Sequence, residues 1–483
     1  MRPHRSVLLL CLWCTAPSQA QVIVDWVQPA TGLAIALDQE NNVFTVNYDA
    51  NLGGDITLTK RNSAGDLLWN AAYDQTSTTR TDRATWVATD QQNNAIVTGT
   101  VTSGYSNPVN ANSLVMKFDP AGELLWRVVY EADFDGSSTR KCVVDKANNI
   151  YVLGLGMGPN GLVTKVKKLD PEGGTVWDWY DAAGIGAPIN IKFTPDSQLV
   201  ISARGITGNI NGYARIDRDG NTVWSLPGVP SFTVGDAAGD AFGNTYCVHG
   251  TAASGGGSII RKLSPSGALL WQNTYGIIAY RVEVGSDGAP VVSGFPLNGS
   301  GGAAFLKASI DGDQIWLNND ADGPNNFLLH AQMLLDADDN AYLCAGILFA
   351  MAVCKVNSDG TGAWYVTAGT GNAQGFALGS DQAVYVVGGS TVRLGQDIST
   401  VLDEPGAAPG LHAYPSPAHK DLVVEWPGHH IAHWRIRSAT GALLKEGRQW
   451  SAPLDLGELR PGVLLVELWD VDGARGILRV VKE

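Results

Sequence analysis

A tryptophan that returns seven times, each time four residues after a glycine, predicts an all-β fold. We expect an eight-bladed β-propeller that is closed by its N-terminal strand and followed by a small antiparallel β-sandwich. The composition agrees, because 45% apolar residues, 17% charged residues and 57 glycines describe a packed, turn-rich β protein. The repeat stops near Gly395 and a different strand rhythm follows, which predicts the second domain.

Each repeat reads as four short strands joined by two kinds of turn. An Asp/Asn turn such as DQENN or DKANN follows the first strand, and a glycine turn such as DPAG or DPEG precedes the tryptophan strand. The glycine is expected to supply the positive φ of its turn. Four antiparallel strands per unit match one propeller blade. The pairs are Gly65/Trp69, Gly122/Trp126, Gly173/Trp177, Gly220/Trp224, Gly267/Trp271, Gly312/Trp316 and Gly360/Trp364.

An eighth unit, Gly375 to Gly395, has three strands and no tryptophan after them. The missing strand is expected at the other end of the chain, where Trp26 stands in the run QVIVDWVQ without strands of its own before it. Pairing these two segments would complete the last blade and remove two exposed strand edges. We expect the tryptophan rings to pack between neighbouring blades rather than to bind a ligand.

The first twenty residues read as a secretory signal. Arg2 and Arg5 precede the apolar run Val7 to Trp13, and small residues stand at Ser18 and Ala20, so we expect the mature chain to begin at Gln21. A lipoprotein anchor on Cys11 or Cys14 is the less favoured alternative, because the residues before them are not small. No later run of about 20 apolar residues predicts a membrane helix.

The charge excludes one class of partner. The whole chain carries a formal net charge of −14, and removal of Arg2 and Arg5 makes the mature chain more acidic. Nonspecific binding to nucleic acid or to an anionic membrane is therefore not expected.

Cysteines and turn carboxylates leave two alternatives open. Cys142, Cys247, Cys344 and Cys354 each lie in an apolar run and are expected to be small buried side chains, although Cys344 and Cys354 could instead oxidise across a hairpin. The acidic turns Asp336 to Asn340 and Asn318 to Gly323 are interpreted as Asx turns, with calcium as the alternative. We expect no cofactor and no other metal site.

The run D-x-x-G-x-x-x-W, as in Asp119 to Trp126, resembles the tryptophan-docking motif of pyrroloquinoline-quinone-type propellers. That resemblance covers the repeat region only, and the chain lacks the vicinal cysteines of the quinone enzymes, so no quinone chemistry is expected. The strands of the form NN-Y-V-x-G are closer to the secreted bacterial repeats of the SBBP and delta-60 kind, whose members have scaffold or binding roles.

Four short motifs mark the C-terminal segment: the YPSPA opening with Tyr414, Pro415 and Pro417, a turn glycine at Gly441, the strand LRPGVLL with Gly462, and the closing RVVKE with Lys482. In their order and position they resemble the type A sorting domain of type IX secretion cargo of the Bacteroidetes. The resemblance implies the type IX machinery as a partner and a secreted or outer-membrane surface location. We therefore expect a signal peptide at 1–20, a propeller at 21–400, a linker at 401–412 and a sorting domain at 413–483.

The histidines His429, His430 and His433 of this segment are interpreted as a solvated loop tip rather than a metal site.

Two functions from different classes remain. The first is a noncatalytic binding or scaffold module, because no catalytic constellation stands out and the propeller region has only His249 and His330 as histidines. Basic groups at the channel mouth would then attract an anionic ligand such as an acidic surface glycan, or a protein. These candidate ligand-face residues are Arg83, Arg140, Lys192, Arg281 and His330, with Lys141 beside them.

The alternative function is a secreted polysaccharide- or peptide-degrading enzyme with its site at the channel. It would need two carboxylates brought together from separate blades. The acidic candidates are Asp82, Asp135, Asp236 and Glu283.

Overall fold

The computed structural model describes residues 22–482 except for 50–54, 74–81, 103–110, 131–138, 159–160, 206–207, 252–255, 298–301, 322–328, 348–349, 397–410, 415–417, 439–442, 449, 451–452, 460–461 and 472–474. All regular elements among these residues are β-strands. The chain divides into two compact units, one ending at Asp397 and the other beginning at Ile398.

The larger unit contains eight four-stranded antiparallel sheets among its described residues. The first half of this unit holds four of them. They are β2 (Ala34–Leu37), β3 (Val43–Asp49), β4 (Asp55–Arg61) and β5 (Leu67–Tyr73); β6 (Asp82–Thr89), β7 (Ala95–Thr102), β8 (Ala111–Phe118) and β9 (Leu124–Tyr130); β10 (Thr139–Val144), β11 (Ile150–Gly158), β12 (Gly161–Leu169) and β13 (Thr175–Tyr180); β14 (Ala187–Phe193), β15 (Leu199–Arg204), β16 (Ile210–Ile216) and β17 (Thr222–Pro230).

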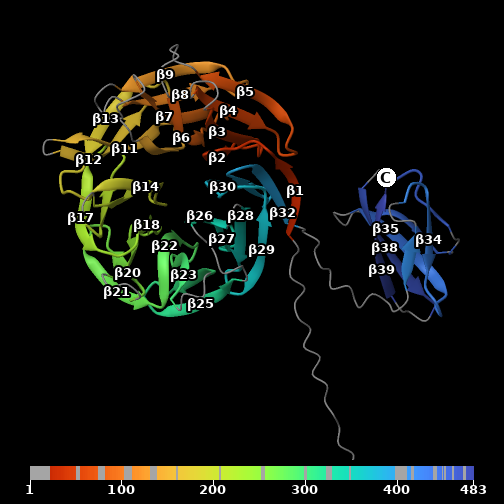
Figure 1. The fold of residues 1–483 in the computed structure, drawn as a ribbon. Helices are drawn as coiled ribbons and strands as arrows, with labels where there is room; N and C mark the ends of the chain where they lie inside the picture. Colours follow the sequence, from red (N-terminus) through yellow and green to blue (C-terminus); the bar gives the residue numbers. More distant parts are fainter. Residues whose placement is uncertain are drawn as a thin grey trace, which may run out of the picture. The chain divides into compact units, whose positions relative to one another are not determined.

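The second half repeats the arrangement, and its last sheet takes one strand from the N-terminus. The sheets are β18 (Asp236–Gly239), β19 (Thr245–Gly250), β20 (Ser258–Leu263) and β21 (Leu269–Tyr275); β22 (Ile277–Val284), β23 (Pro290–Pro296), β24 (Ala303–Ala308) and β25 (Gln314–Ala321); β26 (Leu329–Leu335), β27 (Ala341–Ile347), β28 (Ala350–Val356) and β29 (Gly362–Ala368); β30 (Gly375–Leu378), β31 (Val384–Val387), β32 (Thr391–Gln396) and β1 (Val22–Gln28). Figure 1 shows these sheets side by side around a ring, with the first strand of each nearest the centre.

The two ends of this unit meet in one sheet. Strand β1 pairs antiparallel with β32, from Val22 opposite Gln396 to Gln28 opposite Thr391. The first strand of this sheet, β30, contacts β2 of the first sheet. The expected pairing of the N-terminal segment with the last repeat is therefore present.

The repeated tryptophan of one sheet packs on the repeated glycine of the next. The seven glycines have φ between 85° and 94°, as expected for their turns, and a Cβ added to any of them would lie 2.6–3.1 Å from an atom of the preceding sheet's tryptophan. Trp26 of β1 packs in this way on Gly65 of the first sheet. The indole N–H also donates to a backbone carbonyl of that neighbouring turn over 2.9–3.1 Å in six cases, namely Trp26, Trp69, Trp126, Trp177, Trp271 and Trp316.

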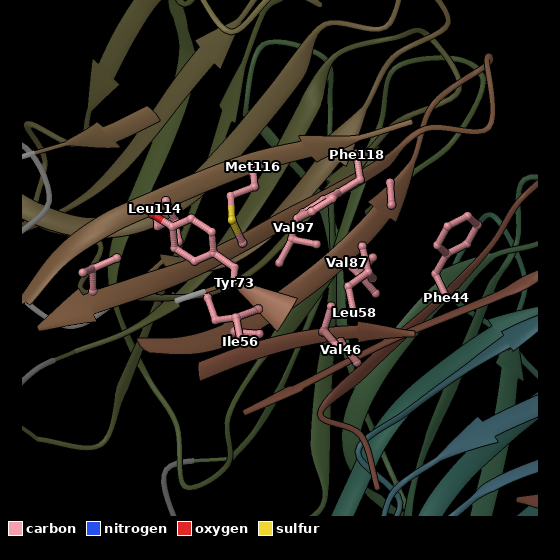
Figure 2. Close-up of a cluster of buried hydrophobic side chains, with 14 residues drawn as sticks. Phe44, Val46, Ile56, Leu58, Tyr73, Val87, Val97, Leu114, Met116 and Phe118 are labelled. Carbon is pink, nitrogen blue, oxygen red and sulfur yellow. The ribbon is translucent and has the colours of Figure 1, made fainter. Parts of the chain in front are cut away.

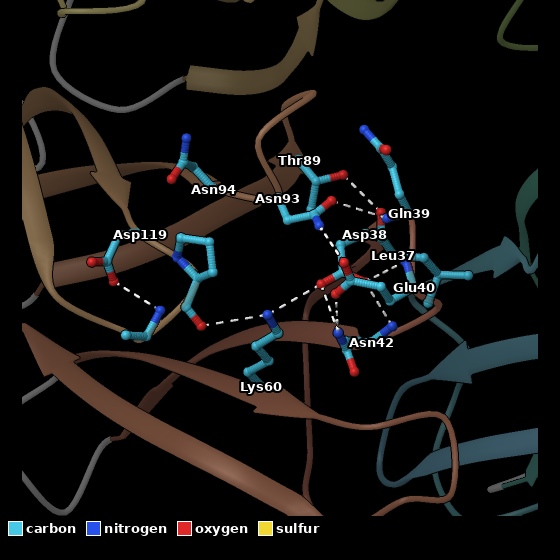
Figure 3. Close-up of polar contacts among 12 residues, drawn as sticks. Leu37, Asp38, Gln39, Glu40, Asn42, Lys60, Thr89, Asn93, Asn94 and Asp119 are labelled. Carbon is cyan, nitrogen blue, oxygen red and sulfur yellow. Dashed lines mark hydrogen bonds and ion pairs between the residues drawn. The ribbon is translucent and has the colours of Figure 1, made fainter.

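The Asp/Asn turns between the first two strands are closed by the aspartate. Asp38 Oδ1 accepts the backbone N–H groups of Glu40 and Asn42, and its Oδ2 lies 3.1 Å from Lys60 Nζ on the third strand (Figure 3). Asp336 makes the same two turn bonds, as expected for an Asx turn, and its Oδ2 accepts from Tyr342. The acidic run Asn318 to Gly323 lies partly outside the described residues.

Apolar side chains fill the space between neighbouring sheets. Figure 2 shows one such core, in which Phe44, Ile56 and Leu58 of the first sheet meet Val97 and Met116 of the second. Burial of side chains of this size stabilises the fold by about 1.5–3 kcal/mol each. Since every sheet is covered by a neighbour on both faces, its middle strands are apolar on both sides, as in Tyr246 to Val248 of β19.

The four cysteines among the described residues are buried and free, as the simpler interpretation expects. The alternative disulfide between Cys344 and Cys354 is wrong. Cys344 lies opposite Val353 while Cys354 lies opposite Leu343, so the two thiols point to opposite faces of their hairpin and pack in different cores. Burial raises the pKa of the Cys354 thiol to about 12, which keeps it protonated.

The smaller unit has two antiparallel sheets that pack around one core. One contains β33 (His412–Tyr414), β34 (Asp421–Glu425) and β37 (Leu454–Asp455). The other contains β36 (Leu443–Gly447), β35 (Ile431–Ser438), β38 (Gly462–Asp470) and β39 (Arg475–Lys482). Leu422, Val424, Ile436 and Val466 are among the buried residues between them.

Within the part of the chain that the structure describes, we find no helix of the length and hydropathy needed to cross a membrane.

Two substitutions distinguish the energetic contribution of the glycine–tryptophan contact from that of backbone strain. We expect Gly122→Ala to destabilise the larger unit by about 2–4 kcal/mol, because it adds a clash with Trp69 to the strain of a positive φ. Gly184→Ala is the matched control, since Gly184 also has a positive φ but has no atom near its missing Cβ, and we expect about 1–2 kcal/mol there. Urea denaturation measures both, and equal losses would contradict a role for the tryptophan contact.

Candidate functional site

The first strands of six neighbouring sheets, β6, β10, β14, β18, β22 and β26, line a cavity of about 320 Å³. Six charged side chains line it, and we call them the channel cluster: Arg140, Lys141, Lys192, Asp236, Arg281 and Glu283. They come from β10, β14, β18 and β22, each the first strand of its sheet, and Figure 1 shows β14, β18 and β22 close to the centre of the ring. Residues far apart in the sequence are therefore brought together only because each sheet presents its first strand to the same centre.

A β-bulge on the inner strands helps to turn these side chains toward the cavity. The register shifts between Thr139 and Lys141 in β10, between Pro188 and Asn190 in β14, and between Ala279 and Arg281 in β22. A bulge re-aims the side chains next to it. Both Arg140 and Lys141 line the cavity as a result, although consecutive residues of a regular strand point to opposite faces.

Lys192 joins the two acidic members of the cluster. Its Nζ lies 2.8 Å from Asp236 Oδ2 and 2.8 Å from Glu283 Oε1, and it donates to the carbonyl of Val282 over 2.7 Å. Asp236 is only 1% exposed. Burial would lower the pKa of Lys192, but the two carboxylates outweigh it and raise that pKa. Lys192 therefore carries a stable positive charge.

The two carboxylates respond differently to the same lysine. Burial would raise the pKa of Asp236, but the charges of Lys192 and Arg281 lower it, so Asp236 stays ionised. For Glu283, burial dominates and its pKa is raised. Both oxygens lie 2.8 Å from one nitrogen, so they are no further apart than twice that distance. Such a spacing suits paired-carboxylate chemistry, but the lysine between them occupies the position that a reacting group would need.

Lys141 has a different environment in the same cavity. Its Nζ donates to Asn190 Oδ1 over 2.8 Å and lies 4.8 Å from the centre of the Trp86 ring. Among the described residues it has no carboxylate within ion-pair distance. Burial lowers the pKa of Lys141 to about 8, and the positive charge of Lys192 acts in the same direction.

The predicted ligand-face residues divide into two groups. Arg140, Lys192 and Arg281 line the cavity, as does Lys141. Arg83 does not line it and instead lies over the Tyr48 ring at 5.2 Å. The backbone of His330 belongs to β26, opposite Ala345, and its side chain is outside the described residues.

Two of the four acidic candidates meet in the channel cluster, namely Asp236 and Glu283. Asp82 is buried at 2% exposure and does not line the cavity. Asp135 lies outside the described residues. Sequence reasoning named Asp236, Glu283 and Lys192 as separate candidates at the channel but had no signal that this lysine joins the two carboxylates.

One further buried histidine has no role in this cavity. His249 is fully buried in β19, and neither of its ring nitrogens has a hydrogen-bond partner among the described residues. Burial lowers its pKa to about 4, so it is neutral at physiological pH.

The solvated-tip interpretation of the C-terminal histidines is wrong for two of them. His429 stacks on Trp426 with ring centres 4.1 Å apart and bonds to Asp470, while His433 stacks on Trp469 at 4.8 Å. Asp470 comes from β38, so the acidic partner of His429 is distant in sequence. Among the described residues, no group of three or more His, Cys, Asp or Glu side chains is arranged to hold a metal.

The sorting-motif residues lie partly within the described structure. Tyr414 is 46% exposed and donates to Glu425. Gly462 begins β38, and Lys482 is buried in β39 next to Ala418. Pro415, Pro417 and Gly441 lie outside the described residues.

No family model matches the chain, and no curated protein matches it. Solved structures match at low sequence identity. The Dos1 propeller aligns with a TM-score of 0.50 at 9% identity, covering 78% of this chain and 94% of that one. The WD40 β-propeller domain of Doa1 has a TM-score of 0.44 at 10% identity, covering 78% of this chain and 98% of that one. A Bacteroides caccae protein of unknown function has a TM-score of 0.35 at 11% identity, covering 65% and 90%. The likeness to the Dos1 propeller, together with the repeated sheets, shows that the larger unit has a β-propeller fold.

The free energy of unfolding tests whether Lys192 stabilises the two buried carboxylates. We expect Lys192→Met to lower the free energy of unfolding by about 3–5 kcal/mol, because it leaves two buried carboxyl groups without their cation. Lys141→Met is the control in the same cavity, where one hydrogen bond to a neutral amide and the contact with the Trp86 ring are lost but no buried carboxylate loses its cation, and about 1–2 kcal/mol is expected. Equal losses in urea denaturation would show that Lys192 is not the centre of the cluster.

Proposed function

We propose that this protein is a noncatalytic binding module: a closed eight-bladed propeller that binds an anionic ligand, such as an acidic glycan, at the channel cluster. The observation that carries the proposal is the charge balance of the cavity. Four cationic side chains and two carboxylates line it, while the whole chain has a net charge of −14. A positively charged concave site attracts anions locally, although the rest of an acidic protein repels them.

The arrangement of the cluster favours binding over catalysis. Its two carboxylates are both engaged by Lys192, so neither is placed to act as a general acid or nucleophile. Arg140 is exposed and has no ion-pair partner among the described residues, which leaves its guanidinium available for a carboxylate or sulfate. Trp86 and Gln332 also line the cavity and supply an apolar face and an amide for a sugar ring.

We further propose that residues 1–20 are a signal peptide, 21–400 the propeller, 401–412 a linker and 413–483 a sorting domain that delivers the propeller to the cell surface or medium. The resemblance of the C-terminal segment to type IX sorting domains supports this route. The two-sheet arrangement of the smaller unit is consistent with a small independent domain.

The binding proposal is tested on acidic glycans. We expect the full chain to bind uronate- or sulfate-bearing glycans on an array, and the double variant Arg140→Ala/Arg281→Ala to lose affinity about a hundredfold, because two charge-assisted contacts are removed. Arg83→Ala is the matched control, since this arginine lies outside the cavity. Absence of binding, or an affinity that the double variant leaves unchanged in calorimetry, would refute the proposal.

Delivery is tested by truncation in a host that has the type IX machinery. We expect the full chain at the surface or in the medium, beginning at Gln21, and a chain that ends at residue 412 to accumulate in the periplasm. Fractionation and mass spectrometry of the N-terminus measure both. Equal export of the two chains would rule out a sorting role for residues 413–483.

A further inference from the structure

The channel cluster contains two lysines whose amines differ sharply in their partners. Lys192 Nζ is held by two carboxylates at 2.8 Å and by a backbone carbonyl at 2.7 Å. Lys141 Nζ donates to the neutral amide oxygen of Asn190 and lies over the Trp86 ring. The Lys192 amine therefore has three acceptors, two of them charged. The Lys141 amine faces the cavity and has one neutral acceptor.

We propose that Lys141 is a nucleophile that captures a small anionic aldehyde or ketone in the channel cavity as an imine. The inference rests on the proposed function, because it uses the same cavity and the same preference for anions. It adds to that function a covalent step and a ligand class, the anionic carbonyl compounds.

The cavity provides the surroundings that make a lysine reactive. An amine becomes nucleophilic when it is desolvated or placed next to other cations, because both disfavour its protonated form. The charged groups that face Lys141 are Arg140 beside it, Lys192, Arg281, Asp236 and Glu283. With a pKa of about 8, about half of the Lys141 amines are neutral at pH 8. Lys192 remains protonated there because its pKa is raised.

The covalent step needs no oxidant or reductant. The nitrogen lone pair of neutral Lys141 forms a bond to the carbonyl carbon, and the carbonyl π electrons move to its oxygen, which receives a proton from the nitrogen by way of water. The resulting carbinolamine then loses water as the nitrogen forms a double bond to carbon. Amine and carbonyl thus give imine and water. Arg140 and Arg281 provide positive charge on the same cavity wall for the carboxylate of the ligand.

The experiment labels the full chain with glyoxylate, an anionic aldehyde, in the presence of cyanoborohydride, which reduces an imine to a stable secondary amine. Peptide mapping by mass spectrometry follows the rate at each lysine. We expect Lys141 to be labelled at least about tenfold faster than Lys192 or the exposed Lys146, with a rate that rises with pH around 8. Propionaldehyde, which has no charge, is expected to show a smaller preference for Lys141.

Two controls separate the possible causes of failure. Lys141→Arg keeps the positive charge but has no nucleophilic amine, so the fast labelling at this position should be lost. Methyl glucuronide, which has a carboxylate but no free aldehyde, reports noncovalent binding at the cavity. Binding of the glucuronide without preferential labelling of Lys141 would overturn the covalent inference alone. If neither binding nor preferential labelling is found, both this inference and the proposed function are wrong.

Discussion

The packing of one sheet's tryptophan on the next sheet's glycine is the interaction on which the rest of the larger unit depends. Each contact places a flat ring against a turn that has no Cβ, and the indole N–H of most of these tryptophans binds a carbonyl of that turn. Spacing and angle between neighbouring sheets are therefore specified by a hydrogen bond and a steric fit together. Apolar cores between sheets contribute more of the stability, but they have no comparable directional bond.

This interaction also joins the two ends of the repeat region. Trp26 belongs to β1, which pairs with β32, and its ring packs on Gly65 of the first sheet. The contact that relates each of the first seven sheets to the one before it thus also relates the first sheet to the last. Because β1 covers the edge of β32, the last sheet gains its fourth strand from the N-terminal segment.

The central cavity follows from this regular arrangement and from local departures from it. Identical placement of the sheets brings their first strands to one centre, and the bulges in β10, β14 and β22 turn polar side chains into it. The cationic side chains of the cluster differ in whether they contact a carboxylate. Lys192 satisfies Asp236 and Glu283, so Arg140 and Lys141 contribute positive charge that no carboxylate contact neutralises among the described residues.

The sequence by itself determined the repeat, the all-β class and the positive φ of the turn glycines, because each of these is encoded in a local pattern that returns with every unit. It also determined the pairing of the N-terminal strand, because the eighth unit lacks the tryptophan strand that the N-terminal segment supplies. It also identified Arg140, Lys192, Arg281, Asp236 and Glu283 as candidates. Only the tertiary structure decided that Arg83 lies elsewhere, that Lys192 bridges two carboxylates, that Cys344 and Cys354 point to opposite faces, and that His429 pairs with Asp470. These outcomes depend on register and on contacts between distant strands, and a shift of one residue in a strand reverses the face of every side chain.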